Sequence, residues 1–259
     1  MAIAEQRADR SVRDLVSPEE WQLRVDIAAC YRLIALEGWD DLVFTHISGR
    51  VPGGDGHFLI NPFGMLFEEI TASSLVKIDK NGEKVLASDY DPNGPGFVIH
   101  GAVLGARDDV NCVIHLHTDA GQAVSAQKAG LLPLTQTAMF LDGEVGYHDF
   151  EGVATDLEER ERLVADLGPR HCMILRNHGT LAAGAHPADA YWRVYLLERA
   201  CIAQIMAQGG GSELQIPTTG SIARTAKVAQ DGLAKGTAQR LLWPAMIRRL
   251  DRVDPGYKD

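Results

Sequence analysis

The sequence lacks long uncharged apolar runs and basic clusters. No stretch approaches the roughly 18 apolar residues of a membrane-spanning helix, and residues 1–10 carry charges where a secretory signal peptide would be apolar. A formal net charge of −10 without clustered Lys and Arg argues against a nucleic-acid or anionic-membrane partner, because such binding needs positive charge to displace counterions. We therefore expect a cytoplasmic protein whose partners include no nucleic acid and no membrane.

Cysteine is scarce and unpaired in the sequence. The 4 cysteines occur singly inside apolar segments, without the Cys-x-x-Cys spacing of a zinc knuckle or redox pair. This usage is typical of small core residues in a reducing compartment.

Internal repeats are also lacking. Hydrophobic residues make up 46% of the 259 residues, which is enough for the core of a single α/β domain.

Turn and capping residues divide the chain into three parts. Residues 1–16 are polar and are expected to form an N-terminal arm. A single domain is predicted over residues 17–209, starting where Ser17 can cap a helix whose first residue is Pro18. Glu20 can complete a capping box for this helix, and Gly38 is expected to end it. Residues 210–259 begin with a glycine-rich stretch, so we interpret them as a linker and a C-terminal helical extension.

Between these boundaries, short apolar segments separated by turn residues predict an antiparallel sheet. The predicted segments lie at 43–51, 57–60, 66–70 and 75–79. Thr155 and Glu158 form a possible capping box for a later helix. The helix expected at 187–209 is apolar on more than one side, which indicates a subunit interface.

The main functional signal is Cys-Val-Ile-His-Leu-His-Thr-Asp at residues 112–119. Its apolar residues predict a buried strand, and strand side chains alternate with period two, so His115 and His117 point the same way. Two imidazoles on one face can bind one divalent ion. His178, which follows a second apolar strand and precedes a glycine, is the candidate third ligand. The alternative is that each ring only hydrogen-bonds a backbone carbonyl.

These motifs together resemble the class II aldolase and adducin family. The markers are Phe-Val-Ile-His at 97–100, His-Leu-His at 115–117 and Arg-Asn-His-Gly at 176–179. The resemblance implies a three-layer α/β/α single domain with a central, largely antiparallel sheet, assembled as a homotetramer with active sites at subunit interfaces. It also implies one divalent metal per chain, with zinc favoured and manganese or iron as alternatives. Its implied ligands are His115, His117 and His178.

The sequence departs from the family pattern at two places. Aldolases and epimerases of the family carry an acid four residues before the histidine that matches His100, whereas this chain has Gly96 there. The Gly-Asn pair that helps to bind a substrate phosphate is replaced by Thr45 and His46. Both departures argue against a sugar phosphate and favour a small, unphosphorylated oxo or hydroxy acid.

The predicted function is therefore a divalent-metal-dependent carbon–carbon lyase, either an aldolase or a decarboxylase. In both reactions bond breakage leaves electrons next to a carbonyl, and the metal stabilises them as an enolate. The catalytic candidates for proton transfer are Tyr257, Glu144 and His148, with Tyr147, His100, Asp89 and Asp91 as further candidates. Two alternatives stay open: a metal-dependent sugar-phosphate epimerase, and a non-catalytic adducin-like interaction module of the cytoskeletal, actin-binding type.

Overall fold

A seven-stranded sheet runs through the centre of the structure, a computed structural model that describes residues 11–152 and 159–259. Its strands are β1 (His46–Arg50), β2 (Phe58–Ile60), β3 (Val76–Ile78), β4 (Cys112–Leu116), β5 (Val145–His148), β6 (Cys172–Leu175) and β7 (Gly179–Gly184). Their order across the sheet is β3-β2-β1-β4-β7-β6-β5. Every neighbouring pair is antiparallel except β5 with β6, which confirms the predicted, largely antiparallel sheet.

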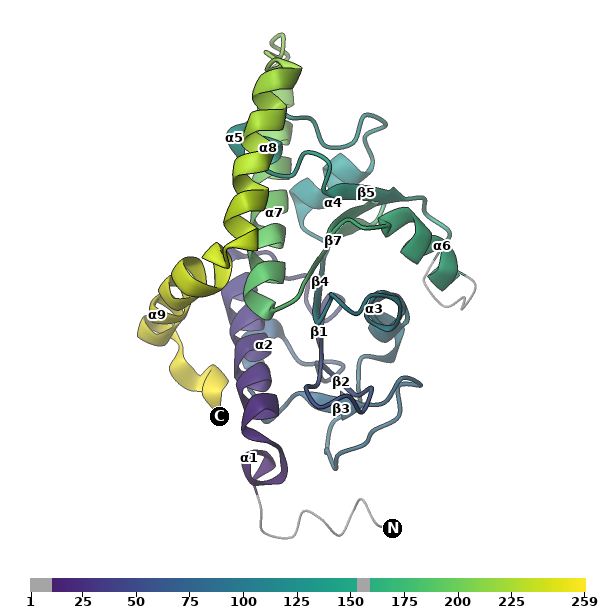
Figure 1. The fold of residues 1–259 in the computed structure, drawn as a ribbon. Helices are drawn as coiled ribbons and strands as arrows, with labels where there is room; N and C mark the ends of the chain where they lie inside the picture. Colours follow the sequence, from purple (N-terminus) through teal and green to yellow (C-terminus); the bar gives the residue numbers. More distant parts are fainter. Residues whose placement is uncertain (1–10, 153–158) are drawn as a thin grey trace.

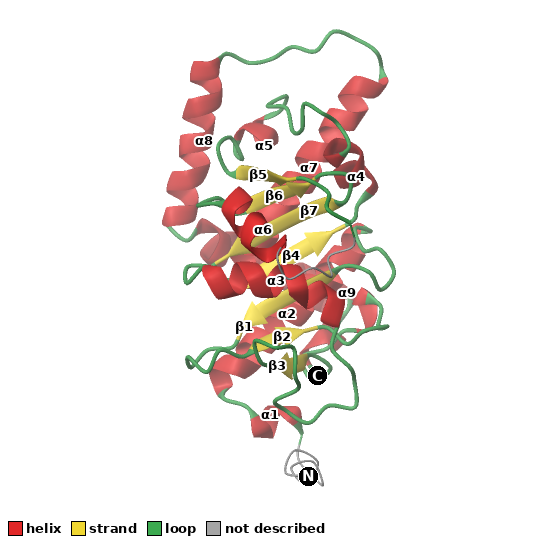
Figure 2. Cartoon of the chain, turned by 90° about the vertical axis from the view of Figure 1, so that its right-hand side faces the viewer, coloured by secondary structure: helices red, strands yellow, loops and turns green. Residues whose placement is uncertain are grey.

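Helices cover both faces of this sheet. The helices are α1 (Val12–Leu15), α2 (Pro18–Glu37), α3 (Gly94–Ala106), α4 (Asp119–Ser125), α5 (Gln136–Met139), α6 (Glu159–Leu167), α7 (Pro187–Gly209), α8 (Thr219–Ala234) and α9 (Trp243–Val253), with short helical turns η2 (Phe67–Glu69), η3 (Ala238–Leu242) and η4 (Pro255–Lys258). Figure 1 shows α2 and α7 on one face and α3 and α6 on the other, and Figure 2 shows α3 and α6 in front of the strands. Each face has its own apolar core. The predicted three-layer α/β/α arrangement is therefore confirmed.

Helix α2 begins and ends where the sequence predicts. The Ser17 hydroxyl accepts a hydrogen bond from the Glu20 backbone N–H at 3.1 Å, and Gly38 ends the helix with a φ of +67°. Only half of the predicted capping box forms, because the buried Glu20 carboxylate pairs with Arg24 at 3.0 Å and Lys77 at 2.7 Å. A buried charge needs such partners more than a helix terminus needs a second cap.

Tyr31 of α2 holds strand β1 in place through the backbone groups of the strand. The Tyr31 hydroxyl donates a hydrogen bond to the Ile47 carbonyl at 2.7 Å and accepts one from the Ile47 N–H at 2.6 Å. Both residues are fully buried, so the two backbone groups would otherwise be unpaired away from water. This contact sets the position of β1 and of its first residue, His46.

Some expectations from the sequence differ from the structure. Residues 66–70, predicted as a sheet segment, contain the 3-10 turn η2, in which Phe67 packs edge-on against Tyr31 at 4.6 Å between ring centroids. A short apolar run does not distinguish a strand from a helical turn, so this tertiary contact decides. The predicted arm at 1–16 includes α1, and its residues 1–10 lie outside the described residues.

The C-terminal part of the chain is largely helical and packs on the helices of the domain. In the segment 210–259, predicted as a linker and helical extension, residues 211–218 have no regular secondary structure. The helical part consists of α8, η3 and α9, which lie alongside α2, α5 and α7. The capping box predicted at Thr155 and Glu158 lies outside the described residues. Within ranges 11–152 and 159–259, no helix combines the length and hydrophobicity needed to cross a membrane.

Candidate metal centre

Three histidines meet where β4 ends and β6 turns into β7. His115 lies in β4, His117 follows this strand, and His178 lies in the β6–β7 turn. The Nε2 atoms of His115 and His117 are 2.9 Å apart. One ring nitrogen from each of the three histidines lies within 4.8 Å of the other two. The fold thus brings together the three residues that the sequence predicts as ligands.

The turn that carries His178 depends on its neighbours in the sequence. Asn177 adopts a φ of +55°, a left-handed conformation that asparagine tolerates better than most residues. A Cβ atom at Gly179 would lie 2.3 Å from the Leu116 carbonyl oxygen, so only glycine lets β7 approach β4 this closely. The Asn-His-Gly sequence is therefore a backbone requirement around the candidate ligand.

The remaining ring nitrogens of His115 and His117 have oxygen partners. The Nδ1 atom of His115 lies 2.9 Å from the Thr180 carbonyl oxygen, and Nδ1 of His117 lies 3.1 Å from the Asp41 carboxylate. Both oxygens only accept, so the geometry assigns each proton to Nδ1 and leaves a lone pair on each Nε2. Two lone pairs 2.9 Å apart repel each other unless a cation lies beside them. The arrangement fits a divalent ion.

Burial keeps two of the three imidazoles, those of His115 and His178, neutral. The pKa of His178 is lowered to about 4, first by burial and then by the neighbouring His117. Burial also lowers the pKa of His115 well below its ordinary value, with His46 as the next cause. Neutral imidazole is the form that binds a metal ion, so at neutral pH no proton has to leave these two rings before binding.

The three histidines line a cavity of about 470 Å³. Its rim contains Phe44, Phe63 and Phe150, whose side chains are exposed at 58%, 56% and 55%. Of the lining residues that the structure describes, none is lysine or arginine, and Asp41 is the one carboxylate. The cavity therefore offers metal ligands and apolar surface but no positive side chain.

Two polar groups of this cavity were missed as site residues from the sequence. Asp41 lies in the loop before β1, 76 positions from its partner His117, and no local pattern connects the two. His46 was interpreted only as part of a lost phosphate site, yet it lines the cavity. The sequence signal available was a predicted strand at 43–51 in the same sheet as the histidines. This signal is too weak to select either residue.

The predicted catalytic residues Tyr257 and His148 have partners elsewhere. Tyr257 is fully buried, and its hydroxyl donates a hydrogen bond to Asp251 at 2.9 Å. The Nδ1 atom of His148 lies 2.8 Å from Asp166 of α6. Neither Tyr257 nor His148 is among the described residues that line the histidine cavity. Their roles in proton transfer stay predictions.

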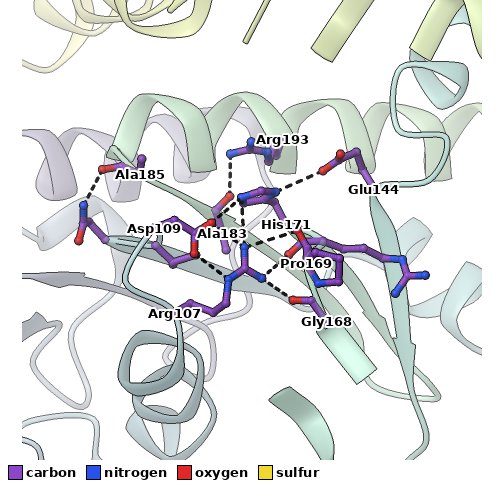
Figure 3. Close-up of polar contacts among 12 residues, drawn as sticks. Arg107, Asp109, Glu144, Gly168, Pro169, His171, Ala183, Ala185 and Arg193 are labelled. Carbon is purple, nitrogen blue, oxygen red and sulfur yellow. Dashed lines mark hydrogen bonds and ion pairs between the residues drawn. The ribbon is translucent and has the colours of Figure 1, made fainter. Parts of the chain in front are cut away.

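Glu144, the third predicted catalytic residue, belongs to a different polar cluster (Figure 3). Its carboxylate lies 3.3 Å from Nδ1 of His171, and Nε2 of His171 lies 3.4 Å from Asp109, which pairs with Arg107 at 2.7 Å. The hydrogen bond from His171 lowers the pKa of Glu144. His171 precedes β6 and His178 follows it, so the structure separates Glu144 from the metal centre by the length of this strand.

The further candidates are also placed by the structure. Tyr147 accepts a hydrogen bond from the Leu131 N–H at 3.1 Å. Asp89 and Asp91 lie in an exposed loop, where Asp91 pairs with Lys84 at 3.1 Å. The ring of His100 lies 4.2 Å, between centroids, from that of His46, which lines the cavity.

Glu198 of α7 supports the strand that orients His115. Its carboxylate accepts hydrogen bonds from the hydroxyls of Thr118 and Thr180, and the Thr180 carbonyl is the partner of His115. Glu198 is fully buried. Burial raises its pKa to about 7, although the two hydroxyls oppose this shift by favouring the charged form.

Comparisons with known proteins agree with this geometry. The profile of the Class II Aldolase and Adducin N-terminal domain matches residues 25–205. A protein of Caulobacter vibrioides, whose name places it provisionally among the class 2 aldolases, is 51% identical over 96% of both chains. Alpha-adducin of Rattus norvegicus is 38% identical over 91% of this chain and 34% of its own length. A crystal structure of an aldolase II superfamily protein from Pseudomonas syringae is 49% identical, covers 96% of this chain and 99% of its own, and has a TM-score of 0.89.

The contact between Asp41 and His117 can be tested by substitution. Replacing Asp41 with alanine removes the acceptor that orients this ring, and we expect Asp41→Ala to weaken zinc binding about 10- to 100-fold. Isothermal titration of zinc into chelator-treated protein measures the affinity. The matched control is Asp40→Ala, since Asp40 is the neighbouring exposed carboxylate. Equal zinc affinity in Asp41→Ala and the wild type would contradict the assigned role.

The buried carboxyl of Glu198 predicts a pH-dependent stability. Its pKa is 4.5 ordinarily and about 7 in the folded chain, so the folded state holds this proton more tightly. The stabilisation is complete below pH 4.5 and falls as pH rises to 7, by on the order of 3 kcal/mol. Glu198→Gln cannot ionise and should lose this part of the pH dependence in urea unfolding at pH 5 and pH 8. Glu213→Gln, at an exposed site, should behave as the wild type; an unchanged pH dependence in Glu198→Gln would refute the assignment.

Proposed function

Because the chain belongs to the class II aldolase and adducin family, we propose that it is a divalent-metal-dependent carbon–carbon lyase, an aldolase or a decarboxylase. Its proposed substrate is a small, unphosphorylated oxo or hydroxy acid. The observation that carries this proposal is the convergence of three imidazoles on one point of a cavity that has no positive side chain among its described lining residues.

The histidines would hold one ion per chain, and zinc suits three neutral imidazoles best, with manganese or iron as alternatives. When bound, the ion supplies positive charge that stabilises the negative charge left on the substrate when the carbon–carbon bond breaks. The Thr180 carbonyl and the Asp41 carboxylate hold two of the rings in the orientation needed. Three protein ligands leave open positions for a substrate, as in catalytic sites rather than closed structural ones.

The lining of the cavity supports an acid without a phosphate group. A dianionic phosphate is normally held by Arg, Lys or several N–H donors. The described lining residues supply neither Arg nor Lys. A carbonyl and a neighbouring carboxylate oxygen can instead chelate the ion directly, which requires no additional positive charge from the protein.

We also propose a homotetramer with its active sites at subunit interfaces. The three phenylalanines at the rim form an exposed apolar surface around the cavity, and Met206 of α7 is 75% exposed. Apolar surface of this kind is typical of an interaction site. Tyr257, Glu144 and His148 do not line the cavity of their own chain, so proton transfer by any of them requires a neighbouring subunit or a rearrangement.

A non-catalytic interaction module is the second candidate function, because the similarity to alpha-adducin extends over 91% of this chain. The histidine cluster separates the two candidates, since a docking domain has no need of three converging metal ligands. A sugar-phosphate epimerase is the remaining alternative. It would use the same ion but would interconvert substrates without releasing a fragment.

Metal analysis and product analysis test the proposed reaction. We expect one divalent ion per chain in the wild type and in His57→Ala, and loss of the ion in His117→Ala. Carbon dioxide and pyruvate assays over a panel of oxo and hydroxy acids should show turnover that vanishes with a chelator and returns with metal. Fuculose phosphate and ribulose phosphate should not react. Robust cleavage of these sugar phosphates would contradict the proposed substrate class, and a wild type without metal would favour the interaction module.

Light scattering tests the proposed assembly. We expect a mass of four chains at micromolar concentration, because the exposed apolar rim and α7 surface need to be covered. A monomer under these conditions would rule out the tetramer.

A further inference from the structure

The ring of His46 fills the space that a side chain at position 96 would occupy. A Cβ atom at Gly96 would lie 2.7 Å from Cγ and Nδ1 of His46 and 2.8 Å from its Cδ2. Real Cβ atoms do not approach other atoms this closely, since carbon contacts are optimal at about 3.5–4.0 Å. Gly96 lies in the first turn of α3, and His46 begins β1. Helix α3 can therefore approach β1 here only because residue 96 is glycine.

His46 is buried without a hydrogen-bond partner. Its side chain is on the cavity wall, and the residue is 4% exposed. Neither ring nitrogen completes a hydrogen bond of normal geometry in the described part of the chain, although backbone groups of Phe44 and Gly96 lie near the ring. Buried polar groups are nearly always hydrogen-bonded, so two unpaired nitrogens on one ring need an explanation. A ligand that enters the cavity would provide it.

The strand register places His46 beside the metal centre. His46 pairs with His115 across β1 and β4, so the two side chains lie on the same face of the sheet, with 5.2 Å between ring centroids. The converging metal ligands are His115, His117 and His178, and His46 is not one of this group. It is close enough to contact a molecule held by the three.

The other neighbour of His46 is a histidine with a fixed partner. The ring centroid of His100 lies 4.2 Å from that of His46. Nδ1 of His100 lies 2.6 Å from the Ser48 hydroxyl. His100 and Ser48 thus form a pair behind His46, and this pair leaves the His46 nitrogens available to a ligand.

We propose that His46 is a substrate-binding residue that donates a hydrogen bond from a ring N–H to a carboxylate oxygen of the substrate. This inference rests on the proposed function, and it assigns the acid specificity of the cavity to one residue. A neutral imidazole offers one donor and one acceptor, and it does not repel an acid. A carboxylate at the same place would repel the substrate's own negative charge. Gly96 is the complementary requirement, because it provides the room for the ring.

Oxalate binding to the zinc-loaded protein tests this role. Oxalate is the probe because it combines a chelating oxygen pair with carboxylate charge. By isothermal titration we expect His46→Ala to bind oxalate about tenfold more weakly than the wild type, as expected for loss of a hydrogen bond to a charged group. Zinc content should stay at one ion per chain. His46→Gln, which restores an N–H donor, should recover part of the affinity.

The controls separate this inference from the proposed function. His57, beyond the other end of β1, provides the matched histidine, and His57→Ala should bind zinc and oxalate as the wild type does. If His46→Ala carries zinc and binds oxalate with unchanged affinity, the role of His46 is overturned while the metal centre stands. If the wild type binds no zinc, the proposed function fails and this inference fails with it.

A thermal-stability cycle tests the packing of His46 against Gly96 without any ligand. Alanine is more favourable than glycine in a helix, so Gly96→Ala should raise Tm when His46 is also alanine. With His46 in place, Gly96→Ala should lower Tm because the ring must move. The control Gly105→Ala, in the same helix with nothing within 4 Å of the added Cβ, should raise Tm in both backgrounds. The same effect of Gly96→Ala in both backgrounds would overturn the packing.

Discussion

The antiparallel pairing of β4 with β7 is the constraint on which the candidate metal centre depends. Leu116 pairs with Thr180, so the residue after Leu116 and the turn before β7 emerge side by side at one edge of the sheet. His117 and His178 occupy these positions. The same register brings the Thr180 carbonyl to His115, and Glu198 joins the two strands through their threonine hydroxyls. A shift of one residue would reverse the face of every side chain and disperse the histidines.

Burial has two linked effects on this centre. It lowers the pKa of His115 and His178, which keeps these two rings neutral and able to bind a metal ion, and it raises the pKa of Glu198, which favours the neutral form of this carboxyl behind them. The cavity wall continues this pattern with His46, an imidazole where a carboxylate side chain would add negative charge. In the proposed reaction, the positive charge comes from the ion alone, which suits a substrate that is itself an acid.

The accuracy of the sequence-based predictions varied with the range of the interactions involved. The bounds of α2 were predicted because Ser17, Pro18 and Gly38 act on their own helix. Residues 66–70 were predicted wrongly, because the contact of Phe67 with Tyr31 decides their conformation and joins distant parts of the chain. The capping role predicted for Glu20 was wrong for the same reason, since its carboxylate pairs with Lys77 of strand β3.

The sequence by itself determined the candidate ligand set: alternation along a strand aligns His115 with His117, and the Asn-His-Gly turn places His178 at a strand end. These are local properties of a backbone with fixed periodicity. Only the tertiary structure decided what surrounds these three histidines. Asp41 reaches His117 across 76 positions, and His46 takes the space beside Gly96 because β1 and α3 meet there. Such contacts depend on how whole elements pack, and no short pattern of residues carries that information.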